Sequence, residues 1–186
     1  MNDMKYKRTI ILHNGDELLI RNADRNDGPA AYDIFKKCHE ETDYLLSYSD
    51  ENNYDLAQEG EHLQERTDSE NSIEVIAIVN NVPVATAGIE PIGKKYKVKH
   101  RAQFGIGVLK KYWGLGIGKE LLKSCIELAK QAGYEQLELD VVSDNSRAIS
   151  LYKHLGFVEY GRNPKGFKTK TSGYQELVYM YLDLSK

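Results

Sequence analysis

Glycines at alternate positions separate a predicted strand from a predicted helix in the middle of the chain. Residues 104–109 alternate as a strand does, and Gly114, Gly116 and Gly118 follow them closely. The apolar residues after these glycines recur at helical spacing, which places the glycines at a helix N-terminus. Unpaired N–H groups there attract an anion, and a residue without a Cβ lets a phosphate come close. The stretch therefore predicts a phosphate-binding turn, with a tight turn that binds nothing as the alternative.

Two common nucleotide-binding motifs fail at specific positions of this turn. The dinucleotide motif G-x-G-x-x-G requires a third glycine where Lys119 stands. The motif G-x-x-x-x-G-K-[ST] requires a glycine where Trp113 stands and a hydroxyl residue where Glu120 stands. The pattern that remains is x-x-G-x-G at the start of a helix.

A second group of polar residues accompanies the next predicted strand and helix. The strand covers residues 136–142, Asn145 stands near the start of the helix, and Tyr152 lies on its inward face. An asparagine at a helix start caps the helix, and an inward tyrosine packs in a core with its hydroxyl hydrogen-bonded. Gly156 stands where a helix C-terminus favours a left-handed residue.

Together the two segments resemble the GNAT superfamily of N-acetyltransferases in sequence, order and separation. Gly116 and Gly118 match the glycines of its pyrophosphate loop, Q/R-x-x-G-x-G/A, while Trp113 stands where the family has Gln or Arg. The second segment is similar to the pattern N-x-x-A-x-x-L-Y-x-x-x-G-F through Asn145, Ala148, Leu151, Tyr152, Gly156 and Phe157. The resemblance covers residues 73–184 and implies an α/β fold of the α+β type. Its central sheet is mixed, mostly antiparallel and splayed at the central strand, with helices on both faces.

The resemblance also implies acetyl-CoA as co-substrate, no metal, and a set of residues that hold the coenzyme. These are Ile106, Gly107, Val108, Trp113, Gly114, Gly116, Ile117, Gly118, Lys119, Asn145 and Tyr152. Main-chain N–H groups near Val108 are expected to stabilise the oxyanion. In the family the matching tyrosine protonates the departing thiolate. A phenol with a pKa of about 10 can protonate a thiolate with a pKa of about 8.5 only when the two are held in contact.

The general base is the least determined part of this prediction. Many family members carry a carboxylate at the start of the central strand, where this chain has Ala102 and Gln103. His100 is the nearest titratable residue with a suitable pKa, and Glu90 is the next. The open alternatives are that His100 is a loop or edge-strand residue, and that a chain of waters carries the proton to solvent.

Acidic and aromatic residues are interleaved in residues 41–54, which follow the first predicted helix. Such a segment can attract and orient a cationic amine, so Glu41, Tyr44 and Tyr48 are candidates for acceptor binding. A solvated helical face and a loop are the alternative for most of the acids in residues 40–74.

Length and composition favour one domain over residues 1–186. The 186 residues are 41% hydrophobic with only 4 prolines, enough for a substantial core. A net charge of -3 gives the molecule no attraction to nucleic acid or to anionic membranes, and the basic residues 93–101 are expected in an exposed hairpin loop. No hydrophobic signal or membrane-spanning stretch occurs, and Cys38 and Cys125 are expected in the core, so a cytoplasmic location fits.

The remaining elements are expected from turn signals and alternation. Hairpins are predicted for residues 9–21 around Asn14-Gly15 and for residues 73–89 around Asn80-Asn81, with a helix that begins near Pro29 between them. The last strands are predicted at residues 157–161 and 176–184, joined by a loop rich in Gly, Lys and Thr over residues 162–174.

The sequence therefore predicts transfer of an acetyl group from acetyl-CoA to a primary amine. The acceptor is a small molecule or a peptide or protein N-terminus, attacked directly in a ternary complex, and a homodimer stays open. One alternative is a non-catalytic domain that binds or senses acyl-CoA. The other is a nucleic-acid-associated protein that uses the basic residues 94–101.

Overall fold

Eight strands form a single sheet in the computed structural model, which describes residues 6–51 and 55–185. The strands are β1 (Lys7–Ile11), β2 (Glu17–Asn22), β3 (Ile73–Val79), β4 (Val82–Pro91), β5 (Arg101–Val108), β6 (Gln136–Val142), β7 (Val158–Thr169) and β8 (Gly173–Asp183). The helices are α1 (Gly28–Glu41), α2 (Leu56–Asp68), α3 (Ile117–Gln131) and α4 (Ser146–His154), with short 3-10 turns η1 (Arg25–Asp27), η2 (Ser49–Glu51) and η3 (Lys110–Tyr112).

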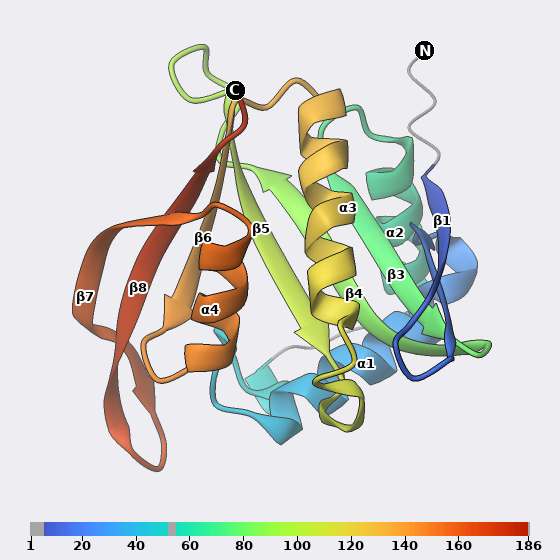
Figure 1. The fold of residues 1–186 in the computed structure, drawn as a ribbon, viewed down its shortest axis with the longest axis horizontal. Coiled ribbons are helices and arrows are strands. Elements are labelled where there is room, and N and C mark those ends of the chain that lie inside the picture. Colours follow the sequence, from blue (N-terminus) through green and yellow to red (C-terminus); the bar gives the residue numbers. More distant parts are fainter. Residues whose placement is uncertain (1–5, 52–54, 186) are drawn as a thin grey trace.

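The sheet opens at its central strand. The strand order is β1-β2-β3-β4-β5-β6-β8-β7, and every neighbouring pair is antiparallel except β5 and β6. These two parallel strands pair only from Arg101↔Gln136 to Gln103↔Glu138 and then diverge (Figure 1). Beyond Gln103, the edge of β5 that faces β6 has no strand partner in the described part of the chain. The predicted sheet, mixed, mostly antiparallel and splayed at the central strand, is confirmed.

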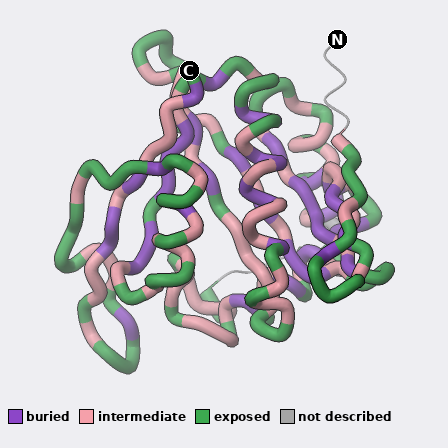
Figure 2. The backbone as a smooth tube through the Cα atoms, in the orientation of Figure 1, coloured by how far each residue is buried: buried purple, intermediate pink, exposed green. Residues whose placement is uncertain are grey.

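Helices cover both faces, as predicted. Helices α3 and α4 lie in front of the sheet in Figure 1, and α1 and α2 lie behind it. Figure 2 shows that the central strands and the inner side of α3 are the most deeply buried parts. The buried face of α3 includes Ile117, Leu121, Cys125 and Leu128, at the predicted helical spacing. The residues of β5 alternate between the faces, so Ala102 and Phe104 join the core under α3 while their neighbours face α1.

The C-terminal strands are longer than the sequence suggests. Residues 162–174, predicted as a loop, mostly belong to β7 and β8, which are joined by a tight turn at residues 170–172. The pairing shifts register between Glu159 and Gly161 and again between Asn163 and Phe167, and these irregularities take up the glycines and Pro164. The loop prediction was wrong because strand-breaking residues in a bulged edge strand look like a loop.

None of the helices in residues 6–51 and 55–185 is both long enough and apolar enough to cross a membrane. Cys38 and Cys125 are both buried and unpaired with each other, as expected for core residues.

Candidate active site

The glycine turn lies between the end of β5 and the start of α3. Gly114 and Gly116 adopt left-handed backbone conformations, with φ of +82° and +88°, and Gly116 is the residue immediately before the helix. Gly118 lies in the first helical turn, where the N–H groups have no partner within the helix. Ile117 is buried in the core, so this residue can offer only its main chain to a ligand. The turn therefore has the geometry of an anion site, as its sequence predicts.

Trp113 connects this turn to the elements on either side of the splay. Its indole Nε1 donates a hydrogen bond of 2.7 Å to the carbonyl oxygen of Val108 at the end of β5. The guanidinium of Arg147, in the first turn of α4, lies 5.5 Å from the centre of the indole ring. Trp113 thus contacts both β5 and α4 at the place where the family pattern has Gln or Arg.

The two polar residues of the second segment lie at the start of α4 and on its buried face. The side-chain oxygen of Asn145 accepts a hydrogen bond of 3.2 Å from the N–H of Ala148, which caps the helix as predicted. Tyr152 is buried, with the rings of Phe104 and Phe157 at centroid distances of 6.4 and 5.8 Å. Burial raises the pKa of Tyr152 to about 12. The phenol therefore keeps its proton at neutral pH and can serve as a proton donor.

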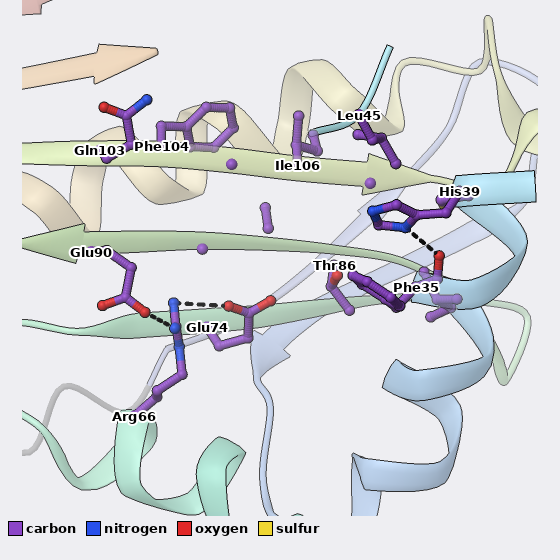
Figure 3. Close-up of a pocket in the computed structure, with 16 residues that line it drawn as sticks. Phe35, His39, Leu45, Arg66, Glu74, Thr86, Glu90, Gln103, Phe104 and Ile106 are labelled. Carbon is purple, nitrogen blue, oxygen red and sulfur yellow. Dashed lines mark hydrogen bonds and ion pairs between the residues drawn. The ribbon is translucent and has the colours of Figure 1, made fainter. Parts of the chain in front are cut away.

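A cavity of about 330 Å³ lies on the other face of β5, between this strand, β4 and α1. Phe35 and Leu45 form part of an apolar wall (Figure 3). Gly105 and Gly107 of β5 also line the cavity, and we call this part of the central strand its floor. A side chain at Gly105 would meet no atom within 4 Å, so the floor leaves space directly above the central strand. An acceptor in this cavity would contact the same strand that leads into the glycine turn.

A cluster of charged groups forms one end of the cavity. Arg66 of α2 lies between Glu74 of β3 and Glu90 of β4 (Figure 3). Its Nη2 is 3.1 Å from Glu74 Oε2, and its Nη1 forms an ion pair with Glu90 Oε1. Burial raises the pKa of Glu74 to about 7, although Arg66 opposes the shift. The cavity thus contains a carboxylate whose pKa burial shifts toward neutral pH.

The structure separates the two predicted bases. Glu90 lines the cavity together with Ile106 and Gly107, which were predicted to contact the coenzyme. His100 precedes β5 at the closed end of the splay and is absent from the cavity lining. Its carbonyl oxygen accepts hydrogen bonds from the N–H groups of Glu135 and Gln136 at 3.0 and 3.2 Å.

The predicted acceptor-binding segment packs across the open end of the splay. We call residues 42–51 the strap; residues 52–54, which complete the predicted segment, lie outside the described residues. Glu41, at the end of α1, accepts a hydrogen bond of 2.7 Å from the N–H of Lys110. The Tyr48 hydroxyl accepts one of 2.8 Å from the N–H of Lys170, in the turn between β7 and β8. Glu41 and Tyr48 therefore hold the strap in place.

Tyr44 lies at a second cavity of about 360 Å³, under the strap. Its lining joins the strap to the glycine turn and to the second half of the sheet. The residues are Glu41, Thr42, Asp43, Tyr44, Lys110, Trp113, Asp144 and Gln175. The strap therefore borders the space at the end of β5 on the side of α1.

Sequence reasoning missed Arg66 and Glu74. The only signal for Glu74 is an acid within the apolar strand IEVIAIV, which usually indicates an exposed position. Nothing in the sequence indicates that α2 brings Arg66 against it. Gly105, on the cavity floor, was assigned only to the strand.

Comparisons with known proteins agree with this geometry. The model of the Acetyltransferase (GNAT) family matches residues 29–157. The L-amino acid N-acetyltransferase AaaT of Escherichia coli is 25% identical over 167 residues, 88% of this chain and 96% of that protein. N-alpha-acetyltransferase 30 of Schizosaccharomyces pombe is 28% identical over 74 residues. The match covers 40% of this chain and 49% of that relative, so the chain spans only about half of the relative's length.

Solved structures show the same fold. An acetyltransferase of the GNAT family from Streptococcus pneumoniae superposes with a TM-score of 0.85 and 26% identity, covering 89% of this chain and 99% of the other. The yncA protein of Salmonella typhimurium, solved with its cofactor acetyl-CoA, gives a TM-score of 0.79 and 21% identity, covering 90% of this chain and 94% of the other. With a family model that matches most of its length, the chain belongs to the acetyltransferase (GNAT) family.

Proposed function

We propose that this protein transfers the acetyl group of acetyl-CoA to a primary amine, which attacks directly while both substrates are bound. The observation that carries the proposal is the position of β5 between two sites. One end of the strand leads into the glycine turn, and its middle forms the floor of the cavity. Two substrates held along one strand can meet in the orientation that the acetyl transfer requires.

The residues present fit the coenzyme. The N-terminus of α3 and the left-handed glycines offer main-chain N–H groups to its phosphates, and the unpaired edge of β5 after Gln103 offers main-chain groups to its arm. Trp113 and Lys119 flank the same turn in the sequence, and Asn145 stands at the start of α4, whose Arg147 lies over the Trp113 ring. When bound, acetyl-CoA supplies an acetyl group already activated as a thioester.

Tyr152 and a carboxylate divide the proton transfers between them. The Tyr152 hydroxyl gives its proton to the departing thiolate; burial raises the pKa of this phenol to about 12, so it keeps its proton until the thiolate is held in contact with it. A carboxylate in the cavity removes a proton from the acceptor ammonium, whose own pKa is about 10. Of the two residues predicted as the base, Glu90 lines the cavity with a side chain that is 49% exposed, and His100 does not line it.

The acceptor class is a small molecule or a peptide or protein N-terminus. Two observations support an amine of this kind. The names of the two curated relatives both describe transfer to nitrogen, in one case on L-amino acids. The acids of the strap and of the cavity favour a cationic acceptor.

A continuous assay of thiol release tests the proposal. Acetyl-CoA is offered with polyamines, amino acids, aminoglycosides and peptides with free N-termini, and CoA binding is measured separately by calorimetry. We expect thiol release with at least one class of amine. CoA binding without thiol release for any amine would instead support a non-catalytic acyl-CoA-binding domain.

A further inference from the structure

We propose that Glu74 is the residue that receives the proton of the acceptor ammonium, and that Glu90 passes this proton to solvent. The inference rests on the proposed acetyl transfer and identifies the base for it. Glu74 belongs to β3, two strands away from the central strand. Its role follows from the space that the intervening strand leaves open.

A row of residues across the sheet gives Glu74 access to the central strand. Glu74 pairs with Gly88 of β4, and Gly88 pairs with Gly105 of β5. A Cβ at Gly88 would overlap Glu74 Oε2 and would lie 2.8 Å from Arg66 Nη2, so the ion pair occupies the space above this glycine. Directly opposing residues of antiparallel strands are about 4.5–5.5 Å apart. The carboxylate therefore lies one strand away from the empty space above Gly105.

The two carboxylates form an inner and an outer proton acceptor. The side chain of Glu74 is 17% exposed and that of Glu90 is 49% exposed. Arg66 binds both and also donates a hydrogen bond of 3.2 Å to the carbonyl oxygen of Ile73. A guanidinium does not give up its proton, so Arg66 positions the two carboxylates and takes no part in the transfer itself. The proton leaves the cavity through Glu90, the more exposed of the two carboxylates.

The protonation equilibrium of Glu74 suits a base that works near neutral pH. Burial raises its pKa to about 7; Arg66 of α2 opposes the shift, and Glu59 of α2 reinforces it. Two other titratable groups interact with this pair. Glu90 of β4 forms an ion pair with the same Arg66, and Cys125 of α3 is a thiol whose pKa is raised by burial and by the charge of Glu74. A base with a pKa close to the working pH is both deprotonated often enough and strong enough to act.

The proton balance of the reaction is complete with these groups. An N–H bond of the ammonium breaks and an O–H bond forms on Glu74, which leaves a lone pair on nitrogen to attack the thioester carbon. As the carbon–sulfur bond breaks, Tyr152 gives its proton to sulfur and recovers one from the acylated nitrogen through water. One proton per turnover therefore reaches solvent by way of Glu74.

The pH profile of kcat/KM for thiol release tests this role in the wild type and in Glu74→Gln. For the wild type we expect an inflection near pH 7. In Glu74→Gln the rate at pH 7 should fall by roughly 10²–10⁴-fold, and the remaining activity should rise only toward the pKa of the free amine, about 10. CoA affinity, measured by calorimetry, should not change.

Three further variants separate catalysis from folding. Glu74→Asp keeps a carboxylate and should keep an inflection at a lower rate, even if Glu74→Gln does not fold. Glu90→Gln should keep the inflection near pH 7 with a smaller loss, whereas loss of the inflection in this variant alone would make Glu90 the base. Glu59→Gln, outside the cavity lining, keeps the Glu74 carboxylate and should keep the inflection but move it to lower pH, because a negative charge that raises the pKa of Glu74 is removed.

The outcomes distinguish this inference from the function on which it rests. If the wild type releases thiol and Glu74→Gln retains the inflection, Glu74 is not the base, while the acetyl transfer stands. If the wild type releases no thiol with any amine, both proposals fall together.

Discussion

The side chain of Tyr152 has two parts, an aromatic ring that packs in the core and a hydroxyl that is the proposed proton donor. Its ring packs between Phe104 and Phe157, and only the hydroxyl distinguishes it from phenylalanine. In Tyr152→Phe we expect kcat to fall by roughly 10²–10⁴-fold, because the departing thiolate loses its proton donor. CoA affinity and melting temperature should change little, since the apolar body of the side chain remains. Wild-type turnover with a good acceptor would show instead that Tyr152 only packs and that water or the substrate ammonium protonates the thiolate.

A substitution of His100 offers a control for the identity of the general base. The structure places it at the closed end of the splay, outside the cavity lining. We therefore expect His100→Ala to keep the pH dependence of the wild type between about pH 6 and 8, where a free histidine titrates. A flattened profile in this range, measured by thiol release, would restore His100 as the base.

The buried carboxylate of Glu74 also makes stability depend on pH. Its folded-state pKa of about 7 lies above the ordinary value of 4.5, so the folded protein keeps a proton that the unfolded chain loses within this window. Stability from this group is complete below about pH 4.5 and is lost as the pH rises to about 7. We expect the melting temperature of the wild type to fall relative to that of Glu74→Gln between these values. Parallel curves for the two proteins would contradict the raised pKa.

Among the elements, the glycine turn and α3 depend on local rules and could be predicted from the sequence. Helical spacing located the buried face of α3, and Gly133 and Gly156 have the left-handed φ values, +82° and +94°, that helix ends favour. The β7–β8 hairpin could not be predicted, because its irregular register accommodates Gly161, Pro164 and Gly166, which look like loop residues in the sequence.

The residues of the candidate site also fall into two groups, those that local sequence motifs indicate and those that only tertiary packing brings together. Asn145, Tyr152 and the glycines lie within short motifs that can be recognised from the sequence alone. Arg66 and Glu74 meet only because α2 packs on β3, and no local pattern indicates a contact between segments that pack in this way. The short motifs could therefore be located in the sequence, whereas the charged end of the cavity could not.

The substitution Gly118→Val tests whether the glycine turn binds the phosphates of CoA. A Cβ there would make ordinary contacts, 3.6 Å from Leu151 and 3.9 Å from Ile106, so the fold should survive. The added methyl groups block the approach of a phosphate to main-chain N–H groups, and we expect CoA affinity to fall by roughly 10- to 100-fold in calorimetry. Gly105→Ala, on the cavity side of β5, is the matched control and should leave CoA affinity intact. Unchanged affinity in a folded Gly118→Val protein would remove the phosphate assignment.

At the scale of the whole molecule, the two halves of the sheet are joined differently at the two ends of the splay. At the closed end, β5 and β6 pair from Arg101↔Gln136 to Gln103↔Glu138, and Arg101 also binds the buried Glu138 with hydrogen bonds of 2.5 and 2.8 Å. At the open end, side chains replace strand pairing: the strap reaches the β7–β8 turn through Tyr48. The strap therefore combines two functions, a bridge between the halves and a source of negative charge at the end of β5.

Neutralising Glu41, which precedes the strap, and Asp43 within it tests the charge, while the hydrogen bond of Tyr48 to the β7–β8 turn stays in place. In the double variant Glu41→Gln and Asp43→Asn, we expect the acceptor KM to rise about fivefold, for about 1 kcal/mol of lost attraction to a cationic amine. The KM for acetyl-CoA should stay nearly constant. Added salt should raise the acceptor KM of the wild type more than that of the variant, because screening weakens the same attraction. Tyr48→Phe, which removes the hydroxyl that accepts from Lys170 and leaves the charge unchanged, is the control. Equal effects of the double variant on both substrates, or a salt response identical to that of the wild type, would mean that the strap contributes structure and not charge.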